Sequence, residues 1–323
     1  MQKKKVRAAI VGAGAIATGI GTKKYAMTHI ESYRSLSDRV EFVGFAEISN
    51  EQRQLVQDSF PHYKYYESLY ALLNSEHVDI ISICTPDHCH EELVLEALDA
   101  NISGLWCEKP LSLTLKGTRE ILQKSMSGGT PIQVNYFRRF IPEIIDIKEK
   151  IEGNAYGDIK LINGFYSDTY IHNGTHLIDM IQYFAGTVKL KNVSTLGNMK
   201  DDGPVVVFCT INGDYICTIQ PFSRKYYNIF ELDIFCESAR VRICENGRRI
   251  EMYSVKNDIE FLPLKILDPS PRTTLCNWKS AFTNALSNLL DVVDGKENET
   301  LSKPEYSMTT IEFIESIRRI ISC

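Results

Sequence analysis

The segment VRAAIVGAGAIA, residues 6–17, joins a short apolar run to a glycine-rich turn. The run Val6–Val11 suits a strand that is buried inside a parallel sheet. Within the turn, Gly12 permits a tight bend, Gly14 lets a pyrophosphate approach the backbone, and Ala17 keeps the next helix close to the sheet. Free N–H groups at the start of that helix favour phosphate. The Gly-x-Gly-x-x-Ala pattern at a strand-to-helix turn therefore predicts a dinucleotide-binding Rossmann domain.

An acidic residue, Glu47, follows the next strand-like run, Val40–Ala46. A carboxylate there can accept hydrogen bonds from the hydroxyls of an adenosine ribose, and it would repel a 2′-phosphate. Glu47 lies farther from Gly12 than is usual, which predicts an insertion around residues 21–33. Arg53 is a turn or more into the following helix. The order of strand, glycine turn and acidic residue favours a Rossmann unit over an unrelated glycine turn. The carboxylate of Glu47 favours NAD over NADP.

The pattern of elements predicts two domains. Strand-like and helix-like segments alternate at first, which is typical of a doubly wound parallel sheet with helices on both faces. After Asp158, strand-like runs follow one another with turns such as Asn212-Gly213-Asp214 between them. We expect a Rossmann domain over residues 1–135 and, over residues 136–323, an α+β domain with a large, mostly antiparallel open sheet. The expected strands are residues 6–11, 40–46, 80–84, 105–107, 131–137, 159–166, 205–211, 215–222, 229–236 and 240–244, and the expected helices are residues 91–100, 114–126, 142–152, 278–294 and 304–321.

The composition is that of an ordinary folded protein. Of the 323 residues, 44% are hydrophobic and 24% are charged, and the formal net charge is -5, so attraction to nucleic acid or to an anionic membrane is not expected. Nine cysteines are spread along the chain without dense spacing, which favours reduced thiols and a cytoplasmic location. Lys3-Lys4-Lys5 resembles the start of a secretory signal, but the apolar run that follows is the predicted strand and glycine turn. No apolar stretch approaches the roughly 20 residues of a membrane span.

Further motifs occur in order along the chain. They are Cys84-Thr85-Pro86-Asp87 with His90, Glu108-Lys109-Pro110, and Gly-Thr-His-Leu-Ile-Asp at residues 174–179. With the turn at residues 12–17 and the segment NYFRRFIP at residues 135–142, they resemble the glucose–fructose oxidoreductase/inositol dehydrogenase family, Gfo/Idh/MocA. The resemblance covers most of the chain. It implies that the cofactor is contacted by Gly12, Gly14, Ala15, Ile16, Ala17, Glu47, Thr85, Pro86, His90, Glu108 and Lys109.

The same resemblance implies that Lys109 is the acid/base residue near the nicotinamide. Oxidation of an alcohol requires loss of the hydroxyl proton as hydride leaves carbon, and a lysine of lowered pKa can accept that proton. Burial and the cationic nicotinamide ring would lower the pKa of Lys109, while Glu108 would oppose them. Pro110 restricts the local backbone at the carboxyl edge of the sheet. The alternative is a surface lysine beside a helix start.

His176 corresponds to the substrate-side histidine of the family, which hydrogen-bonds the reacting hydroxyl or carbonyl. We expect it in the first turn of a helix, where the helix dipole lowers its pKa and Asp179 raises it. Many family members carry aspartate four residues earlier, where this chain has His172. A neutral imidazole has no fixed negative charge. Either His172 takes over substrate binding or the activity has diverged, and Asp168 is a possible substitute.

The segment CTPDHCH, residues 84–90, is rich in potential metal ligands. A zinc site usually has closer pairs and a second, distant pair, and the sequence has no Cys-x-x-Cys, so we expect no metal. Nucleophilic catalysis by Cys89 or Cys107 with a nearby histidine lacks a third-group signature.

The leading hypothesis is an NAD(H)-dependent oxidoreductase for a sugar, cyclitol or nucleotide-sugar, with Lys109 as acid/base and His176, with His172, orienting the substrate. A non-catalytic NAD-linked sensor on the same fold and an NAD-dependent glycosidase are the alternatives, the first because fold alone does not confer chemistry. Val241 and Ile243 alternate with two arginines, so one face of the second sheet should meet water or a partner. Because the open sheet of this family commonly packs on another copy, we expect a homodimer or homotetramer. The substrate's identity and the direction of reaction are left open.

Overall fold

Six parallel strands form the first sheet of the computed structural model, which describes residues 4–22, 27–186, 188–195, 204–211 and 215–321. The strand order is β3-β2-β1-β4-β5-β6. It reverses between β1 and β4, and sheets of this kind have a crevice at the carboxyl ends of the strands at such a point. The strands are β1 (Val6–Val11), β2 (Val40–Ala46), β3 (Lys64–Tyr66), β4 (Ile80–Ile83), β5 (Gly104–Cys107) and β6 (Ile132–Val134).

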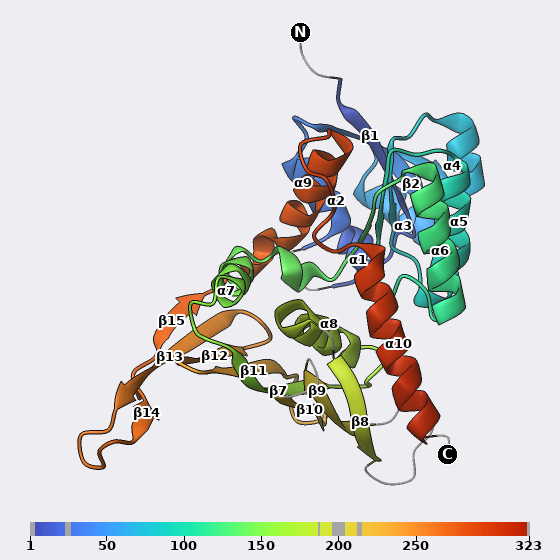
Figure 1. Cartoon of the computed structure of the whole chain (residues 1–323). Coiled ribbons are helices and arrows are strands. Elements are labelled where there is room, and N and C mark those ends of the chain that lie inside the picture. The colour runs from blue at the N-terminus through green and yellow to red at the C-terminus, as the bar shows by residue number, and fades with distance from the viewer. Residues whose placement is uncertain (1–3, 23–26, 187, 196–203, 212–214, 322–323) are drawn as a thin grey trace. The chain divides into compact units, whose positions relative to one another are not determined.

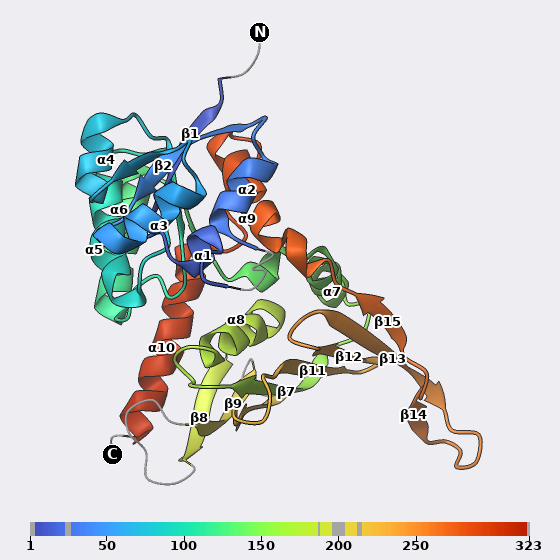
Figure 2. The same ribbon diagram turned by 180° about the vertical axis from the view of Figure 1, so that it is seen from behind.

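Helices cover both faces of this sheet (Figures 1 and 2). One face carries α4 (Leu69–Ser75), α5 (His90–Asp99) and α6 (Leu115–Gly128). The other carries α2 (His29–Ser35) and α9 (Ala281–Val293). Apolar side chains of α5 and α6 pack on those of β4 and β5 in one buried cluster. The predicted doubly wound Rossmann domain is thereby confirmed.

The helix after the glycine turn is short. It comprises α1 (Ala15–Thr18) and ends at Gly19, which has a left-handed backbone. The chain resumes a helix at α2, where the Thr28 hydroxyl accepts a hydrogen bond from the Glu31 N–H at 3.2 Å. The expected insertion around residues 21–33 therefore contributes a second helix to this face of the sheet, and α3 (Asn50–Ser59) follows β2.

The chain divides into two compact units, Met1–Phe140 with Lys279–Thr309, and Ile141–Trp278 with Thr310–Cys323. This differs from the expected division at residues 135 and 136, which placed the whole C-terminal part in the second domain. α9 belongs to the first unit because its apolar face, which includes Phe282, is buried against β5, β6 and α2. The predicted strand at residues 131–137 is shorter, since Phe137–Phe140 forms a 3-10 turn, η2.

The second unit is built on a sheet in the order β14-β13-β12-β11-β7-β10-β9-β8, with β15 beside β13. Among the described strands of this second sheet, only β7 and β10 pair in parallel, so the predicted mostly antiparallel sheet is confirmed. α8 packs on β7, β8 and β11, and α7 contacts α8. The predicted turn at residues 212–214 lies outside the described residues. The elements that lie wholly in this unit are α7 (Pro142–Glu152), β7 (Ile159–Ser167), α8 (Gly174–Ala185), β8 (Val188–Thr195), β9 (Val205–Ile211), β10 (Tyr215–Phe222), β11 (Phe230–Cys236), β12 (Ala239–Cys244), β13 (Arg249–Asn257), β14 (Lys265–Leu267) and β15 (Arg272–Leu275). Two further elements, η3 (Trp278–Ser280) and α10 (Pro304–Ile321), have residues in both units.

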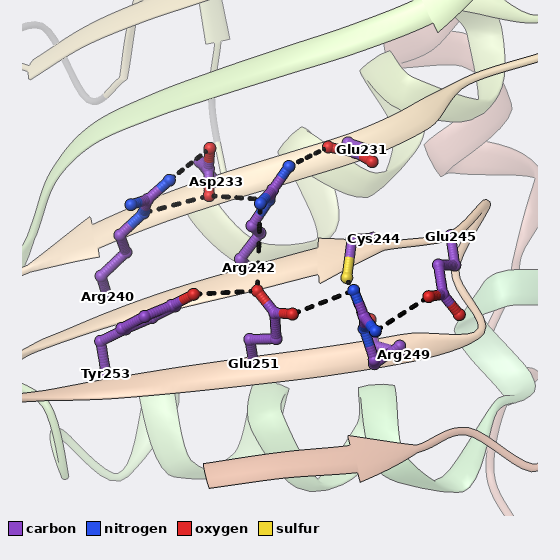
Figure 3. Close-up of polar contacts among 9 residues, drawn as sticks. All are labelled: Glu231, Asp233, Arg240, Arg242, Cys244, Glu245, Arg249, Glu251 and Tyr253. Atoms are coloured by element: carbon purple, nitrogen blue, oxygen red, sulfur yellow. Dashed lines mark hydrogen bonds and ion pairs between the residues drawn. The ribbon is translucent and has the colours of Figure 1, made fainter. Parts of the chain in front are cut away.

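The face of this sheet opposite α8 carries a ladder of ion pairs across β11, β12 and β13 (Figure 3). Val241 and Ile243 are fully buried on the α8 side, as their alternation with arginines predicted. On the other side, Arg240 pairs with Asp233 at 2.9 Å, and Arg242 pairs with Glu231 at 2.6 Å. The charges are compensated within the face, which we call the outer face of the second sheet.

Candidate active site

A pocket of about 730 Å³ lies at the carboxyl ends of β1, β2 and β4. This is the crevice that the reversal of strand order creates. Five of the residues that the family resemblance assigns to the cofactor line this pocket, namely Gly12, Gly14, Glu47, Thr85 and Pro86.

The two glycines of the turn play different parts in this pocket. Gly12 has a φ of +86°, and a Cβ added to it would lie 2.7 Å from the Thr85 nitrogen. Gly14 has an ordinary φ of -72°, and an added Cβ would meet nothing within 4 Å. Gly12 is therefore required for the packing of β1 against the end of β4, whereas Gly14 leaves open space in the pocket lining.

Glu47 is bound to the glycine turn itself. Its Oε2 accepts a hydrogen bond from the Ala13 N–H at 2.8 Å, and its Oε1 accepts one from the Ser49 N–H at 2.9 Å. Gln52 donates from Nε2 to the Ala13 carbonyl at 2.7 Å, a contact that the sequence did not indicate. Each carboxylate oxygen can accept a further hydrogen bond. Glu47 thus fixes the turn and still presents acceptors to the pocket.

Several residues that line the pocket are acidic. Besides Glu47, it contains Glu67, Glu92 and Glu96, and the described lining includes no lysine or arginine. Desolvation by burial raises the pKa of Glu96, and the neighbouring Glu92 raises it further. Arg53 is engaged elsewhere, since it donates to the Glu47 carbonyl at 2.5 Å and to Asn50. The described pocket lining therefore carries acidic side chains without a lysine or arginine to balance them.

Other predicted cofactor residues lie beside the pocket and do not line it. Ala15, Ile16 and Ala17 lie in α1, and Ala17 is fully buried. His90 is also buried, with Nδ1 2.6 Å from the Pro110 carbonyl oxygen and Nε2 2.9 Å from that of Thr85. The His90 ring therefore links the loop after β4 to the loop after β5.

Lys109 is the second residue after β5 and precedes a cis peptide bond to Pro110. Desolvation by burial lowers the pKa of Lys109 below its ordinary value. Glu108 and Asp87 act in the opposite direction, and Arg138 adds to the lowering. Asp87 belongs to η1 (Asp87–Cys89), next to pocket residues Pro86 and His88. A partly exposed lysine of lowered pKa therefore stands at the same sheet edge as the pocket.

The Glu108 carboxylate makes two contacts that sequence reasoning missed. The His29 Nε2 lies 3.0 Å from its Oε1, and Asn135 donates to the same oxygen at 2.5 Å. Despite desolvation, which raises it, the pKa of Glu108 is lowered overall by these hydrogen bonds and by the charges of His29 and Lys109. No local pattern could have indicated His29, because it lies 79 residues from Glu108.

In the second unit, His176 is the third residue of α8 and is half-buried. His172 is exposed in the turn before α8, where its N–H donates to the Thr169 hydroxyl at 3.2 Å. Asp168 forms an ion pair with Arg224 at 3.2 Å. Asp179 is buried on α8. The helix expected to carry His176 is therefore present, and His176 lies in its first turn.

The ligand-rich segment at residues 84–90 separates into different environments. Cys84 is buried, Asp87–Cys89 forms η1, and His90 contacts two carbonyls. Among the described residues, no group of three or more His, Cys, Asp or Glu side chains is arranged to hold a metal ion. Burial, followed by the charge of Glu108, raises the pKa of the Cys84 and Cys107 thiols. Neither thiol is activated as a nucleophile by this environment.

The first unit is a dinucleotide-binding Rossmann domain by its strand order, its glycine turn and its pocket. A model of the oxidoreductase family with an NAD-binding Rossmann fold matches residues 6–136. Residues 6–136 therefore match the Gfo/Idh/MocA oxidoreductase family over its NAD-binding domain.

Relatives of known activity agree with this assignment. The chain is 22% identical over 213 residues to D-glucoside 3-dehydrogenase of Escherichia coli, covering 60% of this chain and 58% of that protein. It is 27% identical over 236 residues to inositol 2-dehydrogenase of Paracoccus denitrificans, covering 68% and 69%. The fold is similar to that of the WlbA dehydrogenase of Bordetella pertussis, solved with NADH and UDP-GlcNAcA, with a TM-score of 0.79 at 15% identity over 99% of this chain and 97% of that chain. Along the described part of the chain, no helix combines the length and apolar character needed to cross a membrane.

Proposed function

We propose that this chain is an NAD(H)-dependent dehydrogenase or reductase that acts on a CH–OH group of a sugar, cyclitol or nucleotide-sugar. The observation that carries the proposal is Lys109, whose pKa is lowered by burial at the edge of the sheet that bears the glycine turn. The family assignment and the dehydrogenase activities of the relatives support it.

The pocket fits a dinucleotide. Gly14 leaves space for a pyrophosphate, and Thr85 lines the same pocket. Glu47 would bind the adenosine ribose hydroxyls. The acidic lining supports NAD over NADP, because a 2′-phosphate would meet several carboxylates. Bound NAD would supply the hydride acceptor, and NADH the donor.

Lys109 would accept the hydroxyl proton during oxidation and return it during reduction. A lowered pKa increases the fraction of neutral amine near neutral pH, which is the form that can act as a base. We assign to His176 the hydrogen bond that orients the reacting oxygen, and to His172 a contact with a neighbouring substrate hydroxyl. His172 is exposed in its turn, as a residue that binds a substrate can be.

The first test is a thermal-shift screen of the full chain with NAD, NADH, NADP and NADPH, alone and with a panel of sugars, cyclitols and nucleotide-sugars. Combinations that stabilise the protein are then assayed for absorbance at the reduced nicotinamide band. The variant Lys109→Met should abolish turnover while the affinity for NAD stays nearly unchanged. Lys116→Met, an exposed lysine on α6, is the matched control and should retain activity. Wild-type turnover by the Lys109 variant would remove Lys109 from the mechanism.

Two other outcomes would redirect the proposal. A protein that binds NAD and a sugar without any redox change would be a sensor, and the histidine at position 172 in place of the family's aspartate motivates that possibility. Release of sugar from a glycoside without net formation of NADH would indicate an NAD-dependent glycosidase.

We further propose that the chain forms a homodimer or homotetramer through the outer face of the second sheet. Phe208 and Ile216 lie on that face, because the strand register places them on the same side as Asp233 and Arg242. Their exposed fractions are 42% and 61%, which is high for large apolar residues on a sheet.

The cysteines within the described residues are free thiols, which supports a cytoplasmic location.

A further inference from the structure

We propose that His29 is a positioning residue that holds the Glu108 carboxylate in its charged form and thereby sets the reactivity of the Lys109 amine. This inference rests on the proposed role of Lys109. His29 lies on α2, in the segment expected only as an insertion, and none of its side chain is exposed. Its ring packs 3.8 Å from that of Trp106 and 5.4 Å from that of Phe282, between centroids.

The donor and the acceptor of each hydrogen bond around His29 can be assigned in turn. An ionised Glu108 can only accept, so the His29 Nε2, 3.0 Å away, must carry the proton. In the neutral ring, Nδ1 then accepts from the Ser82 hydroxyl at 3.1 Å. The Ser82 oxygen in turn accepts from the Tyr33 hydroxyl at 2.7 Å, and burial raises the pKa of Tyr33, which keeps that donor protonated. The chain of donors ends on the Glu108 carboxylate.

The second donor to this carboxylate is Asn135, at 2.5 Å from Oε1. Cys84 and Cys107 also lie near Glu108, and because burial raises the pKa of both thiols, they are uncharged. His29 and Asn135 are therefore the two hydrogen-bond donors that favour the ionised form of Glu108. Replacing His29 by an apolar ring should raise the pKa of Glu108 and favour its neutral form.

Lys109 would respond to that change. The charged groups that act on its amine are Glu108 and Asp87, which raise its pKa, and Arg138, which lowers it, in addition to burial. Loss of the negative charge of Glu108 removes the first of the raising contributions. The pKa of Lys109 should then fall further below its ordinary value, and a loss of packing alone would not produce this shift.

The test measures the charge state of Lys109 without requiring turnover. The full chain is labelled with trace acetic anhydride over a range of pH, and acetylation of each lysine is quantified by peptide mass spectrometry. His29→Phe keeps an aromatic ring but has no donor, whereas His29→Gln keeps a terminal N–H donor. We expect the labelling midpoint of Lys109 to move down by about one pH unit in His29→Phe and to stay at the wild-type value in His29→Gln. Glu108→Gln should move it in the same direction, and Lys116 in the same digests should not move.

An unchanged Lys109 midpoint in a folded His29→Phe protein would overturn the inference. If that variant does not fold, long-range ¹H–¹⁵N spectra of the wild-type histidines decide the question, with His29→Gln used for assignment. A proton on the His29 Nε2 is required, and a neutral ring protonated on Nδ1 alone would refute the proposal. Both measurements are independent of catalysis. Turnover by Lys109→Met would refute the proposed function, and the coupling of His29 to Lys109 would still be tested by the labelling experiment.

Discussion

Replacing Gly12 by alanine should destabilise the first unit, whereas the same change at Gly14 should not. At Gly12 the added methyl would lie 2.7 Å from the Thr85 nitrogen and 2.8 Å from the Cys84 carbonyl carbon, and these are backbone atoms that cannot move aside alone. A left-handed backbone costs a residue with a Cβ about 1–2 kcal/mol, and overpacking adds about 1–3 kcal/mol. The expected loss of unfolding free energy is therefore about 3 kcal/mol.

The assay is urea unfolding followed by tryptophan fluorescence. The chain has two tryptophans, and in a Trp278→Phe background the signal comes from Trp106, which is fully buried in the first unit. With a slope of about 3 kcal/mol per molar urea, the midpoint of Gly12→Ala should fall by about 1 M. Gly14→Ala should unfold at the parent midpoint and lose affinity for NAD, because its methyl enters the open space of the pocket. Equal midpoints for the two variants would refute the reasoning.

Three further outcomes are expected. Glu47→Gln keeps an acceptor oxygen but removes the charge, so the ratio of the NADP to the NAD dissociation constant should fall about tenfold or more. Fluorescence titration measures both constants, and an unchanged ratio would show that Glu47 does not select the cofactor. For alcohol oxidation, kcat/KM should rise with pH as Lys109 loses its proton, and its midpoint should lie below the ordinary lysine pKa of 10.5 because burial lowers the pKa of Lys109. The rate of carbonyl reduction should fall with pH over the same interval. A midpoint at or above 10.5 would contradict the role of Lys109 as acid/base. Ile216→Lys should dissociate the oligomer in sedimentation velocity, while Met126→Lys, at another exposed site on α6, should not. A variant at position 216 that keeps the parent's association state would place the interface elsewhere.

Much of the fold followed from local patterns. Val6–Val11, Val40–Ala46 and Val205–Ile211 form strands at the predicted bounds, because apolar runs bounded by turn residues specify strands through nearby residues alone. The same holds for α7 and α10, whose first residue is a proline at a helix start. The glycine turn was recognisable for the same reason, since its motif is contiguous, and Glu47 was recognisable because it directly follows the second strand.

Other features depended on contacts between residues far apart in the chain. The return of α9 to the Rossmann sheet could not be read from its own amphipathic pattern, because that pattern specifies a buried face and not the surface that covers it. His90 was expected at the cofactor, yet both its ring nitrogens contact backbone carbonyls. A histidine's partners are set by the packing around it.

Local sequence patterns were enough to predict a Rossmann domain with a glycine turn, an acidic residue after the second strand and a lysine after the fifth. The hydrogen bond between Glu108, beside that lysine, and His29, 79 residues away, became visible in the folded structure. Strand and turn formation depend on neighbouring residues, whereas the charge of a buried carboxylate depends on the donors that the completed fold brings to it.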